Sequence, residues 1–144
     1  VETGELFYNC LRYQYDSRVF VQKRDMIHLV TPNQGVKKHD VILYKRKNGN
    51  YILHRVMKTK PDGYVLCGDN QWVLEWGIND EQVLGVLKGF YRGERYVDCE
   101  KNRLYHIYVA IWCFSLAMRK WILKGMNLMR RTGRILRKFP EKSE

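Results

Sequence analysis

The sequence has little of what marks several common protein classes. Its 144 residues include four cysteines, and none lies in a Cys-x-x-Cys pair, so the spacing predicts neither a metal cluster nor a disulfide framework. It shows no low-complexity tract and no internal repeat, which argues against linkers and solenoids. The chain begins at Val1 without a signal-peptide pattern, so we expect either a preceding segment or a protein not secreted by that route. We expect one globular unit that uses no cofactor and no metal.

Acidic residues are scarce in the last third of the chain. Residues 102–144 hold 10 Lys and Arg against 2 Asp and Glu, whereas residues 1–101 hold 16 against 13. The sequence therefore divides into a nearly neutral body, 1–101, and a basic tail, 102–144. A nucleic-acid-binding domain would be basic throughout, so we expect no nucleic-acid partner. At 45% hydrophobic and 13% aromatic residues, the chain can bury a core and is not disordered.

From about residue 19 to residue 96 the sequence alternates short β-rich runs with turn residues. Asn48-Gly49 between two such runs predicts a hairpin, because both residues tolerate a positive φ. Pro61-Asp62-Gly63 predicts a second turn, and Gly85 and Gly89 predict a bulge or a bend in a late strand. The runs are 39–46, 51–58, 64–67 and 81–91. No helix interrupts them, which predicts a mainly β fold of coiled antiparallel sheets or a partial barrel.

The basic tail, unlike the body, has the residue pattern of helices. Leu104 to Met118 is a run of 15 uncharged residues, which as a helix spans about 22 Å, short of a hydrocarbon core of about 30 Å. Residues 121–123 could extend it if Arg119 and Lys120 snorkel. Beyond it, basic and apolar residues recur at helical spacing, which predicts a C-terminal basic amphipathic helix. We expect a membrane-associated protein that binds a membrane surface through residues 104–139; the alternative is a helix packed on the sheet or on a partner chain.

His54 is the first candidate for a catalytic residue. In an alternating strand it shares a face with apolar residues while Arg55 points the other way, a setting in which histidine is more often structural than catalytic. A histidine with an ordinary pKa near 6.5 is nevertheless the natural general base at neutral pH. A carboxylate would then orient its ring: Asp69, in the turn Gly68-Asp69-Asn70, is the first candidate, with Glu75 and Asp80 as alternatives.

A nucleophile is harder to find, because the chain has only three serines. Ser115 lies in the apolar run and Ser143 is next to the last residue, which leaves Ser17 as the one serine before the strands.

Several blocks together resemble the signal peptidase I and LexA-type serine peptidase superfamily, most closely the small signal-peptidase-like proteins of Gram-positive anaerobes. The blocks are Lys37-Lys38-His39-Asp40-Val41-Ile42-Leu43-Tyr44-Lys45-Arg46, Tyr51-Ile52-Leu53-His54-Arg55-Val56, Gly63-Tyr64-Val65-Leu66-Cys67-Gly68-Asp69-Asn70 and Glu81-Gln82-Val83-Leu84-Gly85-Val86-Leu87. The resemblance covers about residues 24–98. It implies coiled β-sheets and hydrolysis of a peptide bond by a serine.

The resemblance also implies residue roles. His54 matches the histidine that one branch of this superfamily uses as its base, Asp69 matches the aspartate of the Gly-Asp-Asn box, and Glu75 lies near the place of a second acid. The family's serine motif, Gly-x-Ser-Met-x-Pro-x-Leu, precedes an Arg-Asp pair that Arg24-Asp25 matches. Counting back without gaps places Tyr15 at the serine, and a two-residue deletion places Ser17 there. Neither alignment gives the methionine or the proline.

We therefore expect a signal-peptidase-like serine endopeptidase that cleaves leader or signal peptides, with Ser17, His54 and Asp69 as catalytic residues and Glu75 as a supporting acid. Its partner would be an extended peptide substrate. The alternative is an inactive family member that binds peptides or a partner protein. A LexA-like DNA-binding repressor is disfavoured, since no helix-turn-helix precedes the strands.

Overall fold

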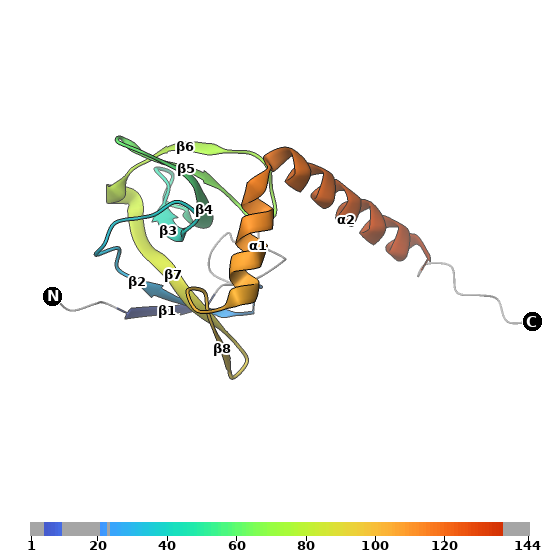
Figure 1. The fold of residues 1–144 in the computed structure, drawn as a ribbon, viewed down its shortest axis with the longest axis horizontal. Coiled ribbons are helices and arrows are strands. Elements are labelled where there is room, and N and C mark those ends of the chain that lie inside the picture. Colours follow the sequence, from blue (N-terminus) through green and yellow to red (C-terminus); the bar gives the residue numbers. More distant parts are fainter. Residues whose placement is uncertain (1–4, 10–20, 23, 137–144) are drawn as a thin grey trace, which may run out of the picture.

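The structure, a computed structural model, describes residues 5–9, 21–22 and 24–136, and it consists of one sheet followed by two helices (Figure 1). The strands are β1 Glu5–Asn9, β2 Met26–Val30, β3 Val41–Lys45, β4 Tyr51–Lys60, β5 Gly63–Cys67, β6 Glu75–Ile78, β7 Val83–Arg92 and β8 Arg95–Asp98. A 3-10 turn, η2 Asp80–Gln82, precedes β7, and the helices are α1 Arg103–Phe114 and α2 Leu116–Leu136. The mainly β fold with a C-terminal helix is confirmed.

The eight strands form a single sheet in which every neighbouring pair is antiparallel. Their order is β1-β2-β7-β3-β4-β5-β6, and β8 pairs with β7. The hairpin predicted at Asn48-Gly49 joins β3 to β4, with Lys45 opposite Tyr51 and Gly49 at a φ of 88°. The turn predicted at Pro61 joins β4 to β5, where Lys60 lies opposite Gly63.

Two bulges bend β7, at the places where its glycines predict them. The pairing of β7 with β2 passes from Gly89 to Leu87, which leaves Lys88 as an extra residue. Its pairing with β3 passes from Gly85 to Val83, which leaves Leu84 as another. Each bulge adds local twist to β7, the strand that pairs with β2, β3 and β8.

Both faces of the central strands are buried, because alternate residues enter two separate cores. On β3, Val41 and Leu43 belong to a core that also contains Tyr105 and Val109 of α1. Ile42 and Tyr44 belong to a second core. The partners of Ile42 and Tyr44 come from β4, β5 and β6: Ile52, Val56, Tyr64, Leu66 and Ile78. Helix α1 therefore covers one face of the sheet, and the other face packs against itself.

The tail forms two helices instead of one. The Asn102 side chain caps α1 by accepting a hydrogen bond from the Tyr105 amide at 3.0 Å. Ser115, with φ −151° and ψ 124°, then interrupts the helical backbone before α2. Helix α1 lies along the sheet, whereas α2 extends away from it (Figure 1). The longer helix expected from snorkelling of Arg119 is therefore wrong: the chain breaks at Ser115, and the Arg119 side chain is fully buried.

Among the described residues, no helix is both long and apolar enough to cross a membrane.

A buried ion pair joins α1 to the sheet. Arg55 of β4 donates to both oxygens of Asp69, at 2.8 and 2.6 Å, and each side chain is only 1% exposed. Arg55 also donates to the His39 carbonyl at 3.0 Å and to the Tyr105 hydroxyl at 3.1 Å. Tyr108 donates to Asp69 at 3.0 Å. Arg55 does face away from His54, as alternation predicts, but α1 buries it there.

The pair predicts a strong effect of Asp69→Asn on stability. Burial alone would raise the pKa of Asp69, but the charge and hydrogen bonds of Arg55 outweigh it and hold that pKa below its usual range. The asparagine would leave Arg55 buried without a counter-charge, so we expect the free energy of unfolding to fall by about 3–5 kcal/mol in urea titrations. The exposed Glu81→Gln is the matched control.

The same pair predicts the sign of the pH dependence. A depressed folded pKa adds stability above the ordinary carboxyl pKa of about 3.9, and that stability is lost as the pH falls from there through the folded value. The native protein should therefore lose stability steeply below about pH 4, and Asp69→Asn should lose less. Equal stability of the variant and the native protein at pH 7 would contradict this account.

Candidate functional site

His54 lies in the middle of β4, on the face of the sheet opposite Arg55. Its ring is buried, and three polar side chains from three other segments surround it. Tyr44 comes from β3, where Ile42 is the residue directly opposite His54. Glu75 is the first residue of β6, and Gln71 lies in the turn that follows β5. The antiparallel order β3-β4-β5-β6 therefore brings these residues together.

One chain of hydrogen bonds fixes the orientation of the imidazole. The Tyr44 hydroxyl donates its single proton to Glu75 Oε2 at 2.6 Å, so its oxygen is left to accept from His54 Nδ1, 3.2 Å away. Glu75 Oε2 itself lies 3.6 Å from Nδ1. The proton of the neutral ring is thereby placed on Nδ1, and the lone pair on Nε2. The Gln71 amide nitrogen lies 3.1 Å from Nε2, where it can donate to that lone pair.

Arg46 keeps Glu75 charged. Its guanidinium binds both carboxylate oxygens, at 2.7 and 2.5 Å. Desolvation works to raise the pKa of Glu75, but the hydrogen bonds from Arg46 and Tyr44 outweigh it and the pKa lies below its usual range. Burial and the bond to Glu75 raise the pKa of Tyr44, so its hydroxyl stays protonated. A carboxylate near Nδ1 stabilises the ring when Nε2 accepts a proton, as it does in hydrolases that pair histidine with an acid.

Gly68 makes room for the ring. A Cβ atom at this position would lie 2.9 Å from His54 Nε2 and 2.7 Å from the Gln71 amide nitrogen, closer than real contacts of this kind. The glycine of the Gly-Asp-Asn turn is therefore needed for space beside the imidazole.

The predicted role of Asp69 is not the one that the structure gives it. Its carboxylate binds Arg55 and Tyr108, on the α1 side of the sheet, and its backbone carbonyl accepts from the Trp112 indole at 2.8 Å. The alternative Asp80 accepts a hydrogen bond from Tyr64. Glu75 is the carboxylate at the histidine, because β6 returns alongside β5 and places it beside Tyr44.

Arg119 holds the same turn from the other side. This fully buried residue of α2 donates to the carbonyls of Trp112, at 3.1 and 2.9 Å, and of Gly68, at 3.3 Å. It also donates to Cys67 Sγ at 3.3 Å and to the Gln71 carbonyl at 3.4 Å. Burial raises the pKa of the Cys67 thiol to about 11, so Cys67 is not a thiolate nucleophile at neutral pH. The turn beside His54 is therefore fixed by Asp69 and Arg119 together.

Ser17 and Tyr15, the two candidates for the nucleophile, lie outside the described residues. Of the predicted site residues that the structure describes, it brings His54 and Glu75 together and places Asp69 on Arg55 instead. Reasoning from the sequence missed Tyr44, Arg46, Gln71 and Arg119. Tyr44 could have been predicted from the hairpin at Asn48-Gly49. The hairpin fixes the register of β3 on β4, and the register determines which residues of β3 share a face with His54.

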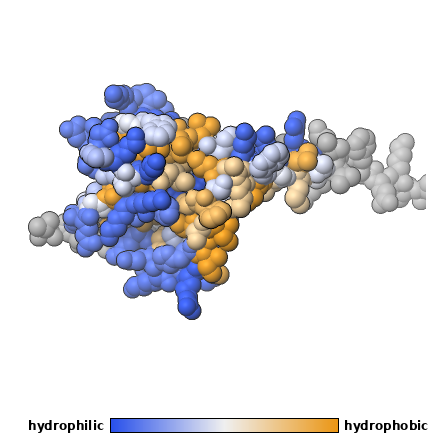
Figure 2. Space-filling view, turned by 45° about the horizontal axis from the view of Figure 1, so that its top comes forward, coloured by the Kyte–Doolittle hydropathy of each residue, from blue (hydrophilic) through white to orange (hydrophobic). Residues whose placement is uncertain are grey.

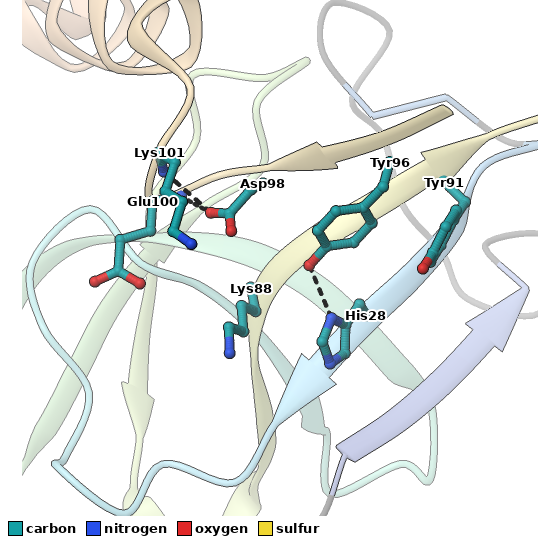
Figure 3. A pocket seen from close by; sticks show the side chains of 7 residues that line it. All are labelled: His28, Lys88, Tyr91, Tyr96, Asp98, Glu100 and Lys101. Carbon is teal, nitrogen blue, oxygen red and sulfur yellow. Dashed lines mark hydrogen bonds between the residues drawn. The ribbon is translucent and has the colours of Figure 1, made fainter. Parts of the chain in front are cut away.

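A cavity of about 430 Å³ lies elsewhere, on β2, β7 and β8, and none of its residues belongs to the His54 network (Figure 3). In it, His28 Nδ1 lies 2.8 Å from the Tyr96 hydroxyl. Lys88, Tyr91 and the segment from Asp98 to Lys101 complete its lining.

Comparison with known proteins finds no match for this chain among family models, curated proteins or solved structures. Its function therefore has to be argued from the residues themselves.

The space beside the imidazole predicts the effect of Gly68→Ala. The added methyl group should displace Gln71 or the His54 ring, and we expect a loss of about 1–3 kcal/mol in the free energy of unfolding. The His54 ring resonances in NMR spectra should move with it. As a control, Gly125→Ala on α2 meets nothing within 4 Å and should leave these resonances unchanged. Unchanged His54 resonances in Gly68→Ala would show that the turn does not confine the ring.

Proposed function

We propose that this protein is a signal-peptidase-like serine endopeptidase that cleaves leader or signal peptides, with His54 as its general base. The observation that carries the proposal is the buried chain from Arg46 through Glu75 and Tyr44 to His54 Nδ1, which leaves the basic lone pair on Nε2. This arrangement is what a base needs in order to gain a proton in the transition state.

The proposed reaction follows from that geometry. Nε2 takes the proton of the Ser17 hydroxyl as the oxygen attacks the scissile carbonyl carbon, and the Gln71 amide moves off Nε2 to admit it. The imidazolium that forms is stabilised through Tyr44 and Glu75. It then gives its proton to the leaving amine as the C–N bond breaks, and a water molecule, activated by Nε2 in the same way, releases the acyl group.

The substrate we propose is an extended peptide. Strand β6 is the edge strand at one end of the described sheet, and the carboxylate of its first residue, Glu75, lies 3.6 Å from His54 Nδ1. An extended peptide can add to such an edge through backbone hydrogen bonds and place alternate side chains against the protein. Val73 and Trp76, both well exposed, are large apolar residues within two positions of Glu75.

The test is cleavage of a fluorogenic signal-peptide substrate by the full chain. We expect Ser17→Ala and His54→Gln each to lower kcat/KM by about 1000-fold or more, and Glu75→Gln to lower it by about 100-fold. Ser143→Ala and His106→Gln are the matched controls and should keep the native rate. Full activity of Ser17→Ala would remove that serine from the mechanism, and full activity of His54→Gln would remove the base.

A second candidate, an inactive relative that binds peptides, is favoured by one observation in the sequence. A different window, residues 4–11, agrees with the family's motif Gly-x-Ser-Met-x-Pro-x-Leu at its glycine and its leucine but not at the serine, methionine or proline, and it has Leu6 at the serine. It lies farther from Arg24-Asp25 than the Tyr15 alignment does. Leu6 lies on β1, opposite Leu29 of β2. A leucine has no nucleophilic oxygen, so in this alignment the chain keeps the base and lacks the serine.

Leu6→Ser separates the two candidates. If the chain is an inactive relative, the native protein should bind the signal peptide without cleaving it, and Leu6→Ser should gain cleavage that His54→Gln abolishes again. If Ser17 is the nucleophile, the native protein is active and Leu6→Ser gains nothing. Peptide binding can be followed by fluorescence anisotropy in every variant. Absence of both binding and cleavage in all of them would contradict both candidates.

A further inference from the structure

Helix α1 leaves an apolar stripe uncovered on the side away from the sheet. Its buried residues, Tyr105, Val109 and Trp112, face the core. The opposite side carries four exposed apolar residues at helical spacing: Leu104, Ile107, Ile111 and Phe114. Phe114 is 84% exposed. Figure 2 shows hydrophobic residues gathered on the side of the body from which α2 extends, whereas the opposite side of the body in this view is mostly hydrophilic.

Helix α2 continues this apolar surface beyond the body. After Leu123 it has no buried residue up to position 133, the last at which burial is described. Its apolar residues nevertheless recur on one face: Met118, Trp121, Ile122, Met126, Leu128 and Met129. Trp121 is 73% exposed and Met129 is 75% exposed. An exposed apolar face of this extent marks a surface that binds a membrane or another protein.

Charge on the same two helices has one sign. Residues 103–136 contain seven Lys and Arg and no Asp or Glu. On α2, Lys120, Lys124 and Arg131 lie on the face opposite the apolar residues, as their spacing requires. Lys124 lies over the ring of Trp121, 5.5 Å from its centroid. Among the cations of 103–133, where burial is described, Arg119 alone is buried, in the contacts described above. The others in that range are exposed.

We propose that the exposed apolar faces of α1 and α2 bind the surface of a membrane that contains anionic lipid. The apolar residues enter the headgroup and acyl boundary, and the basic residues meet lipid phosphates. A second copy docked through the same two helices is a poorer occupant, because residues 103–136 of that copy bring the same cations and no carboxylate to pair with them. A nucleic acid would satisfy the cations but would leave Trp121, Leu128 and Met129 uncovered.

Vesicle flotation of the full chain tests this surface. We expect binding to phosphatidylcholine vesicles that contain phosphatidylglycerol, with much weaker binding to phosphatidylcholine alone and a decline as salt is added. Lys120→Gln with Lys124→Gln should weaken binding to the anionic vesicles about thirtyfold. Leu128→Gln with Met129→Gln, which changes no charge, should weaken it about tenfold or more.

Controls separate this surface from folding and from hydrolysis. Asn127→Gln, an exposed and uncharged change on the basic face, should bind like the native chain, and thermal unfolding should be unchanged in all the α2 variants. His54→Gln should also bind vesicles normally, so the membrane surface and the proposed peptidase can fail separately. Equal binding to the two kinds of vesicle would overturn the proposal. So would unweakened binding by either double variant, or concentration-dependent dimerisation in light scattering with no vesicle binding.

Discussion

The ion pair between Arg55 and Asp69 is the constraint on which the rest of the structure depends. Both side chains are almost fully buried, and a buried charge without its partner costs several kcal/mol. Helix α1 docks over the pair and supplies Tyr105, which accepts from Arg55, and Tyr108, which donates to Asp69. It therefore fixes three segments at once: strand β4, the turn after β5, and the first helix of the tail.

The same constraint sets the geometry of the candidate site. Arg55 and His54 are neighbours on β4 and face opposite sides of the sheet, so holding one orients the other. Asp69 stands two residues before Gln71, and Gly68 lies against the imidazole. Arg119 fixes the same turn from α2. One side of the sheet thus provides a rigid support, and the other provides a histidine whose ring is oriented by Tyr44 and Glu75.

Local signals in the sequence predicted most of the fold. The turn at Asn48-Gly49, the bulges at Gly85 and Gly89 and the helical tail all rest on backbone preferences that act within a few residues. The residues around His54 were harder to predict, because they come from separate strands that meet only when the strands pair. Glu75 reaches His54 because β6 returns beside β5. The sequence favoured Asp69 instead, because it is the aspartate of the Gly-Asp-Asn turn. The burial of Arg119 could not be foreseen, since it depends on the break at Ser115 and on where α1 docks.

The function proposed for the chain requires His54 to carry its proton on Nδ1 and to keep Nε2 as a base. Nitrogen-15 NMR of the His54 ring measures this tautomer directly. At a pH at which the ring is neutral, the account predicts a protonated Nδ1 and an unprotonated Nε2, with the Glu75→Gln variant losing that preference. A proton on Nε2 in the native protein, donated to the Gln71 side chain, would contradict the account, because His54 would then be a structural residue and no base.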